Sequence, residues 1–109
     1  MKQKRYILSI DLGTTAVKAA LVDRSGQALS VGSTPLRLIQ SDDGTAEQDG
    51  RALWEAVLES SRQALDGDAA SDAVVAVAVG AQYSSIIPVD ENNEPLMNMV
   101  MWLDQRGSI

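Results

Sequence analysis

Asp11-Leu12-Gly13-Thr14-Thr15 is a polar stretch between two apolar runs, residues 6–10 before it and residues 16–22 after it. Each run has the length and composition of a strand, and Asp, Gly and Thr favour the turn that joins two strands. The segment therefore predicts a strand, a tight polar turn and a returning antiparallel strand.

The side chains of this turn suit a phosphate group and a metal ion. Gly13 lets an anion come close to the main chain, because glycine takes backbone angles closed to other residues. The amides of such a turn and the hydroxyls of Thr14 and Thr15 donate hydrogen bonds to phosphate oxygens, and Lys18 adds positive charge. Asp11 attracts Mg²⁺, which proteins hold through one or two carboxylates together with waters and phosphates. The same residue types are common in ordinary hairpin turns, so the spacing alone leaves that alternative open.

Length and composition limit the function classes. The chain has 109 residues and a formal net charge of −6, with its basic residues scattered. This predicts one small domain and argues against a nucleic-acid partner or an anionic membrane surface, which both bind clustered Lys and Arg. Histidine and cysteine are absent from the sequence, so acid–base chemistry must use carboxylates, and neither disulfides nor thiolate metal sites form. Because no apolar run reaches membrane length, we expect a cytoplasmic protein.

A third strand and a helix should follow the first two strands. Residues 27–33 come after a short polar turn and predict a strand antiparallel to the second. After a polar loop, Asp49 is the expected N-cap of a helix over residues 50–65, in which apolar residues recur at helical spacing. Trp54 lies on that apolar stripe, so we predict that it belongs to the core rather than to a site. The helix should cover a sheet.

The remaining segments complete an α/β pattern. Residues 73–79 are continuously apolar, as expected for a strand that is buried on both faces and pairs parallel to the first strand. The crossover through the helix should be right-handed. Two short apolar segments, residues 86–89 and 97–102, flank a polar turn and predict a loose hairpin. The predicted order is three antiparallel strands, a helix, a parallel strand and a short hairpin.

Four sequence blocks together resemble the FGGY family of carbohydrate kinases. Residues 11–18 match the family's amino-terminal phosphate loop, whose last position is commonly arginine or lysine. Glu47-Gln48-Asp49, with Trp54, resembles the acidic element and the tryptophan that open the family's first helix. Gly80-Ala81-Gln82 resembles the segment that carries a glutamine at the sugar pocket. Trp102-Leu103-Asp104-Gln105-Arg106 matches the tryptophan, aspartate and arginine pattern of xylulose-kinase-like members.

The resemblance implies a fold, a reaction and a place within a longer protein. The family has the ribonuclease H-like fold of actin-like ATPases, and residues 1–109 resemble an incomplete amino-terminal part of its first domain, with the second domain absent. The family transfers the γ-phosphoryl group of ATP to a hydroxyl of a sugar or polyol, and Mg²⁺ neutralises the developing charge. Its catalytic base corresponds to a position beyond residue 109, so the chain resembles an inactive fragment of a kinase.

Two groups of site residues follow from the resemblance. For Trp102 a place in the core is an alternative, and for Asp104 a cap or an ion pair with Arg106. The phosphate and ATP side would consist of Asp11, which also binds the metal, with Gly13, Thr14, Thr15 and Lys18. The sugar side would consist of Gln82, Tyr83, Ser84, Trp102 and Asp104.

The segment after Gln82 departs from both of the named kinase types. The chain reads Tyr83-Ser84-Ser85 where xylulose kinases usually have methionine, histidine and glycine. Glycerol kinases carry arginine and glutamate there. The resemblance therefore implies a sugar or polyol substrate without naming it, and Tyr83 is a candidate to stack on it or hydrogen-bond to it.

The expected partners are a sugar or polyol substrate and the missing carboxyl-terminal domain. The strand over residues 73–79 would lack a neighbour on one side, and such an edge predicts self-association into a homo-oligomer. A non-catalytic binding or regulatory module with the same fold is the alternative function. An actin-like or acetate-kinase-like ATPase shares the phosphate loop but leaves the three downstream blocks unexplained together.

Overall fold

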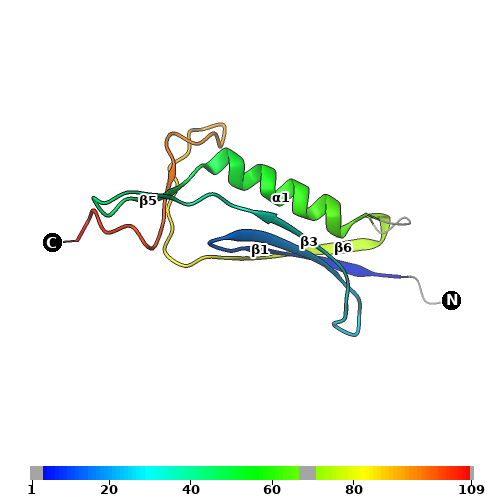
Figure 1. The fold of residues 1–109 in the computed structure, drawn as a ribbon. Helices are drawn as coiled ribbons and strands as arrows, with labels where there is room; N and C mark the ends of the chain where they lie inside the picture. The colour runs from blue at the N-terminus through cyan, green and yellow to red at the C-terminus, as the bar shows by residue number, and fades with distance from the viewer. Residues whose placement is uncertain (1–3, 67–70, 109) are drawn as a thin grey trace.

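The main sheet has four strands, and its order places the first strand in the interior. The computed structural model describes residues 4–66 and 71–108. In the order β3-β2-β1-β6, the first three strands are antiparallel and β6 runs parallel to β1 (Figure 1). The predicted strand order of this sheet is confirmed. The strands are β1 (Tyr6–Leu12), β2 (Ala16–Val22), β3 (Ala28–Pro35) and β6 (Val74–Ala81).

One helix, α1 (Gly50–Ala64), lies across one face of this sheet, over β2 and β3 (Figure 1). It begins as predicted at Asp49, whose carboxylate accepts hydrogen bonds from the amides of Arg51 and Ala52 at 2.8 and 3.2 Å. Such a cap satisfies amides that the first helical turn leaves without partners. The buried apolar core between helix and sheet consists of Leu8, Ile10, Val17, Ala19, Ala56 and Ala64.

The strand β6 lies at the edge of the sheet and is not buried on both faces. Val75, Val77 and Val79 are 62%, 57% and 63% exposed, so the burial predicted for this strand is wrong. The reason is position: β6 has β1 on one side only, and α1 packs against β2 and β3 instead. Trp54 of α1 is also exposed, at 61%, which corrects its prediction as a core residue.

A second, smaller sheet joins segments that are far apart in the sequence. Its order is β4-β5-β7, with antiparallel pairing throughout. The predicted hairpin is present as two isolated bridges, Ile86 with Val100 and Val89 with Pro95. Ala46 and Met99, from two of its strands, form a separate buried cluster with Met101. The remaining elements are β4 (Ile39–Gln40), β5 (Ala46–Gln48), the 3-10 helix η1 (Ser71–Ala73) and β7 (Met99–Val100).

In the described ranges, 4–66 and 71–108, no helix is long and apolar enough to cross a membrane.

Candidate functional site

The turn between β1 and β2 is closed by a backbone hydrogen bond from the amide of Gly13 to the carbonyl of Ala16, at 3.0 Å. A Cβ atom built on Gly13 would lie 2.8 Å from that carbonyl oxygen, closer than real Cβ atoms approach. The positive-φ glycines of the described chain are Gly26 and Gly44. Space, rather than the backbone angles that we predicted, is therefore what requires glycine at position 13.

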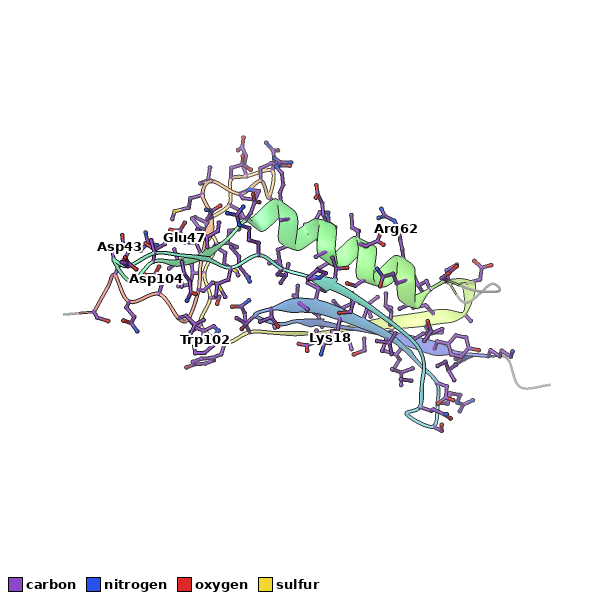
Figure 2. The ribbon with its side chains drawn as sticks, viewed as in Figure 1. Lys18, Asp43, Glu47, Arg62, Trp102 and Asp104 are labelled. Carbon is purple, nitrogen blue, oxygen red and sulfur yellow. The ribbon has the colours of Figure 1, made fainter. Side chains whose placement is uncertain are left out.

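Asp11 and Lys18 are neighbours across the β1–β2 pair, and Gly80 of β6 lies beside Asp11 on its other side. Both charged side chains are exposed. They alternate with the buried residues of their strands, so they project from the face of the sheet opposite to α1. Figure 2 shows Lys18 on the side of the sheet away from the helix. A carboxylate and an ammonium group are thus placed together at the foot of the turn.

Both threonine carbonyls of the turn accept hydrogen bonds from other parts of the chain. The side-chain amide nitrogen of Gln48 donates to the carbonyl of Thr14 at 2.6 Å, and the amide of Leu36 donates to the carbonyl of Thr15 at 2.8 Å. The backbone N–H groups of Thr14 and Thr15 have no hydrogen-bond acceptor in the described part of the chain. The turn is therefore anchored through its carbonyls, while two amide donors are left for a ligand.

Gln82 comes directly after β6 and lies beside the turn. Its backbone amide donates to the carbonyl of Leu12 at 3.0 Å, which extends the pairing of β6 with β1. Its side-chain Nε2 donates to the carbonyl of Gly13 and to Oε1 of Gln48, each at 3.3 Å. The glutamine that we predicted on the sugar side thus donates one hydrogen bond to the turn, at Gly13, and one to Gln48 of β5.

Gln48 is a residue of this site that the sequence analysis quoted only as part of the Glu47-Gln48-Asp49 block and did not assign to the site. It lies in β5 and is 1% exposed, yet both ends of its amide are hydrogen-bonded. The sequence around it, Ala46-Glu47-Gln48, offers no signal for a buried glutamine, because three residues are too few to establish a strand period. A buried amide with both ends engaged fixes the position of its neighbours.

Trp102 connects the last part of the chain to the turn. Its indole Nε1 donates to Oγ1 of Thr14 at 3.3 Å, and its backbone amide donates to Oγ of Ser85 at 3.1 Å. The ring is 51% exposed, so it is neither a core plug nor a free surface side chain. Figure 2 shows it at one end of the main sheet, apart from α1. About half of the surface of Trp102 is therefore accessible next to the turn.

Tyr83 and Ser84 follow Gln82 and are exposed. Tyr83 is 86% exposed, and Ser84 has a φ of 55°, in the left-handed region that ordinary residues rarely adopt. The chain bends at this point after the end of β6. The next residue, Ser85, is hydrogen-bonded to Gln82 and to the backbone amide of Trp102. Tyr83 is therefore more exposed than Trp102, the other aromatic residue predicted on the sugar side.

Asp104 lies outside the cluster around the turn. Its Oδ2 accepts from the amide of Ala46 at 2.9 Å and from Arg106, and its side chain is 7% exposed. Arg106 also pairs with Glu47 at 2.6 Å (Figure 2 labels Asp104 and Glu47). The carboxylate therefore has the ion pair that was our alternative for this residue.

Asp104, Glu47 and Arg106 form an ion-pair group whose pKa values are set by charge and hydrogen bonding. The hydrogen bonds from Arg106, with that from the amide of Ala46, lower the pKa of Asp104 to about 2. The pKa of Glu47 is lowered by its hydrogen bonds from Asn98 and then from Arg106, and the two carboxylates raise the pKa of Arg106. All three groups are charged near neutral pH, so none of them is poised to exchange a proton.

The structure therefore brings Gln82 and Trp102 together with the turn and its two charged neighbours, Asp11 and Lys18. Asp104 is instead hydrogen-bonded to β5 of the second sheet, through the amide of Ala46. In the described part of the chain, carboxylates do not gather in threes as a metal cage requires. Asp11 is the carboxylate at the turn.

The chain matches known proteins over nearly its whole length. A family model described as "FGGY family of carbohydrate kinases, N-terminal domain" matches residues 6–108. A xylulose kinase of Staphylococcus epidermidis is 34% identical over 107 residues, covering 97% of this chain and 22% of the kinase. A glycerol kinase of Rhodospirillum centenum is 35% identical over 108 residues, again 97% of this chain and 22% of the relative.

A solved structure shows the same fold. The crystal structure of a gluconate kinase from Lactobacillus acidophilus superposes with a TM-score of 0.78 at 33% identity, over 94% of this chain and 20% of that one. The chain thus spans about a fifth of the length of the proteins that it matches.

Proposed function

Because the chain belongs to the FGGY family of carbohydrate kinases, we propose that it forms the phosphate side and part of the sugar side of an ATP-dependent sugar or polyol kinase. The reaction is transfer of the γ-phosphoryl group of ATP to a hydroxyl of the acceptor. The observation that carries the proposal is the contact of Trp102 with Thr14, because it unites two of the four family blocks in one site. An ordinary hairpin turn has no need of such a partner.

The turn supplies the phosphate contacts. The backbone amides of Thr14 and Thr15 and the two hydroxyls donate to phosphate oxygens, Lys18 adds positive charge, and Gly13 leaves room for the close turn. These groups are held by the carbonyl anchors of the turn before any ligand arrives. Preorganised donors of this kind lose little energy to reorganisation when charge develops on the phosphates.

Asp11 fits a Mg²⁺ ion that is bound mainly by water and phosphate. One carboxylate beside a phosphate turn is the donor set that Mg²⁺ uses when it bridges a protein and a nucleotide, whereas an all-protein cage would need more carboxylates. Bound there, the ion supplies neutralisation of the phosphate charge. Asp11, which lies beside the small residue Gly80 in the sheet, would be the protein ligand of that ion.

The sugar side divides into contact residues and positioning residues. We assign the contacts with the acceptor to Trp102, Tyr83 and Ser84, whose side chains are exposed. Gln82 keeps one lone pair on Oε1 for a sugar hydroxyl after its contact with Ser85. Asp104 is fully engaged by Arg106 and Ala46, so we assign it the task of holding the segment that carries Trp102.

The rest of the kinase must come from outside these 109 residues. The relatives are about five times longer, and we propose that residues 1–109 are the amino-terminal part of the first of two domains. A general base for the acceptor hydroxyl and most of the adenine pocket would lie in the remainder, in the cytoplasm where ATP is available. The chain alone should therefore not phosphorylate a sugar.

The substrate class is a sugar or polyol. The relatives are named for xylulose, glycerol and gluconate kinases, at nearly equal identity to this chain. The Tyr83-Ser84-Ser85 segment that follows Gln82 differs from what we expect for xylulose and glycerol kinases. We infer that this segment selects the acceptor.

The test is to sequence the encoding locus past the codon for Ile109 and to assay the longest product. Pentoses, hexonates and polyols are each offered with Mg-ATP, and acceptor-dependent ADP formation is measured. We expect activity with one acceptor class in the long product and none in the 109-residue chain. A long product that binds ligands but transfers no phosphoryl group to any acceptor would establish the regulatory module instead.

A further inference from the structure

Five hydrogen bonds form a closed ring that passes through both sides of the site. The ring starts and ends at Thr14, and it joins segments from β5, the end of β6 and the final loop. Its members are Gln48 to the Thr14 carbonyl (2.6 Å), Gln82 to Gln48 (3.3 Å), Ser85 to Gln82 (2.7 Å), the Trp102 amide to Ser85 (3.1 Å) and the Trp102 indole to the Thr14 hydroxyl (3.3 Å).

The direction of every bond in this ring is fixed by its neighbours. Gln48 must present its NH₂ group to the Thr14 carbonyl, so its oxygen faces Gln82. Gln82 then presents NH₂ to that oxygen and to the carbonyl of Gly13, so its own oxygen faces the hydroxyl of Ser85. Turning either amide around would place two donors or two acceptors against each other. The ring therefore has one arrangement of donors and acceptors.

Because Gln48 is buried, its hydrogen-bond partners are difficult to replace. The side chain is 1% exposed, so water does not replace a lost partner, and in the described part of the chain every buried side-chain polar atom has a partner. An amide that loses its partners in such a place carries the cost of its own desolvation. Gln48 thus fixes the distance between the Thr14 carbonyl and the side chain of Gln82.

The ring also orients the hydroxyl of Thr14. Because Oγ1 accepts from the indole of Trp102, its hydrogen points away from the indole and is available to an acceptor such as a phosphate oxygen. A hydroxyl that accepts one hydrogen bond becomes a better donor in the next. The position of the indole on the sugar side therefore affects a donor on the phosphate side.

We propose that Gln48 is a positioning residue that sets the phosphate turn and Trp102 relative to each other. It touches neither ligand, and it acts through Thr14 on one side and through Gln82 and Ser85 on the other. Its role in phosphoryl transfer rests on the proposed kinase function. Its control of the geometry of the turn does not depend on that function.

The first experiment needs no ligand and no activity. The ¹⁵N-labelled 109-residue chain gives two indole N–H signals in NMR spectra, one from Trp102 and one from Trp54, and Trp102→Phe identifies them. We expect Gln48→Met to shift the Trp102 indole signal and the Thr14 amide, although Gln48 has no direct bond to the indole. Exchange of the Trp102 indole proton with solvent should become roughly fivefold faster, the factor of one ordinary hydrogen bond.

Two internal references separate positioning from general loss of stability. The indole of Trp54 belongs to α1, which contributes no member of the ring, so its signal should not move. Gln40→Met makes the same chemical change at an exposed position of β4. If Gln48→Met does not fold, Ser85→Ala breaks the ring at a less buried point, and its expected effect is a shift of the Thr14 amide. An unchanged Trp102 indole in folded Gln48→Met, or an unchanged Thr14 amide in Ser85→Ala, overturns the proposal.

The second experiment uses the long kinase product. Gln48→Met should lower kcat by at least about tenfold, because misplacement of reacting groups costs rate even when binding persists, while KM for the acceptor should change by less than about threefold. Gln40→Met should match the unsubstituted enzyme. An unchanged kcat overturns the role in transfer. A product without any kinase activity overturns the proposed function instead, and the NMR result then decides the ring by itself.

Discussion

Replacing Gly13 by alanine tests whether the turn is as tightly closed as its geometry indicates. The added Cβ would lie 2.8 Å from the carbonyl oxygen of Ala16, well inside the 3.4 Å at which ordinary contact begins. That oxygen is backbone and is the acceptor of the hydrogen bond that closes the turn, so relief requires the main chain to move. We expect a loss of about 1 to 3 kcal/mol in the free energy of unfolding, the range for overpacked sites, of which the weakened hydrogen bond contributes about 1 kcal/mol.

The assay is urea unfolding followed by circular dichroism, with Gly80→Ala as the matched control. A Cβ on Gly80 meets no atom within 4 Å, although Gly80 lies beside Asp11 in the same sheet. The control should unfold within about 0.5 kcal/mol of the unsubstituted chain or be slightly more stable, since alanine reduces the entropy of the unfolded state. Equal unfolding free energies for the two variants would refute the argument that space requires glycine at position 13.

Two further predictions concern the ion-pair group and the sheet edge. Because the folded-state pKa of Asp104 is lowered to about 2 from an ordinary 3.8, its stabilising effect is complete above about pH 4 and is lost as the pH falls towards 2. Asp104→Asn should reduce the pH dependence of the urea unfolding midpoint between pH 4 and 2, whereas Asp42→Asn, at an exposed position, should leave that dependence unchanged. The same pH dependence in both variants would contradict the ion pair. The unpaired β6 edge should make the chain self-associate, and Val77→Lys should suppress this. Light scattering that gives the monomer mass at all micromolar concentrations would rule out that interface.

The main sheet was predictable because its signals are local. Residues 6–22 contain two apolar runs and one polar turn, so the pairing of β1 with β2 follows from the nearest part of the chain. Asp49 and the helical spacing after it gave the start of α1 for the same reason. Gln82 and Trp102 were predicted as site residues by resemblance alone, since no spacing in the sequence relates them to Thr14.

The parts that were missed depend on contacts between distant segments. The strands of the small sheet have two or three residues each, too few to show a period, and β5 pairs with a strand about fifty residues later. Residues in the run over β6 look the same whether the strand is central or at an edge, so the exposure of Val77 was not readable from composition. The role of Gln48 likewise could not be predicted, because it depends on the contact of β5 with the turn at Thr14.

The most direct test of the kinase assignment is the effect of Asp11→Asn on acceptor-dependent ADP formation by the long product. The change keeps the size of the side chain and removes the charge that would hold Mg²⁺ against the phosphates. We predict a loss in kcat of at least about a hundredfold, with the fold retained and with Asp66→Asn, an exposed control, near full activity. An Asp11→Asn protein that keeps most of its kcat would contradict the assignment of this turn as the phosphate side of the site.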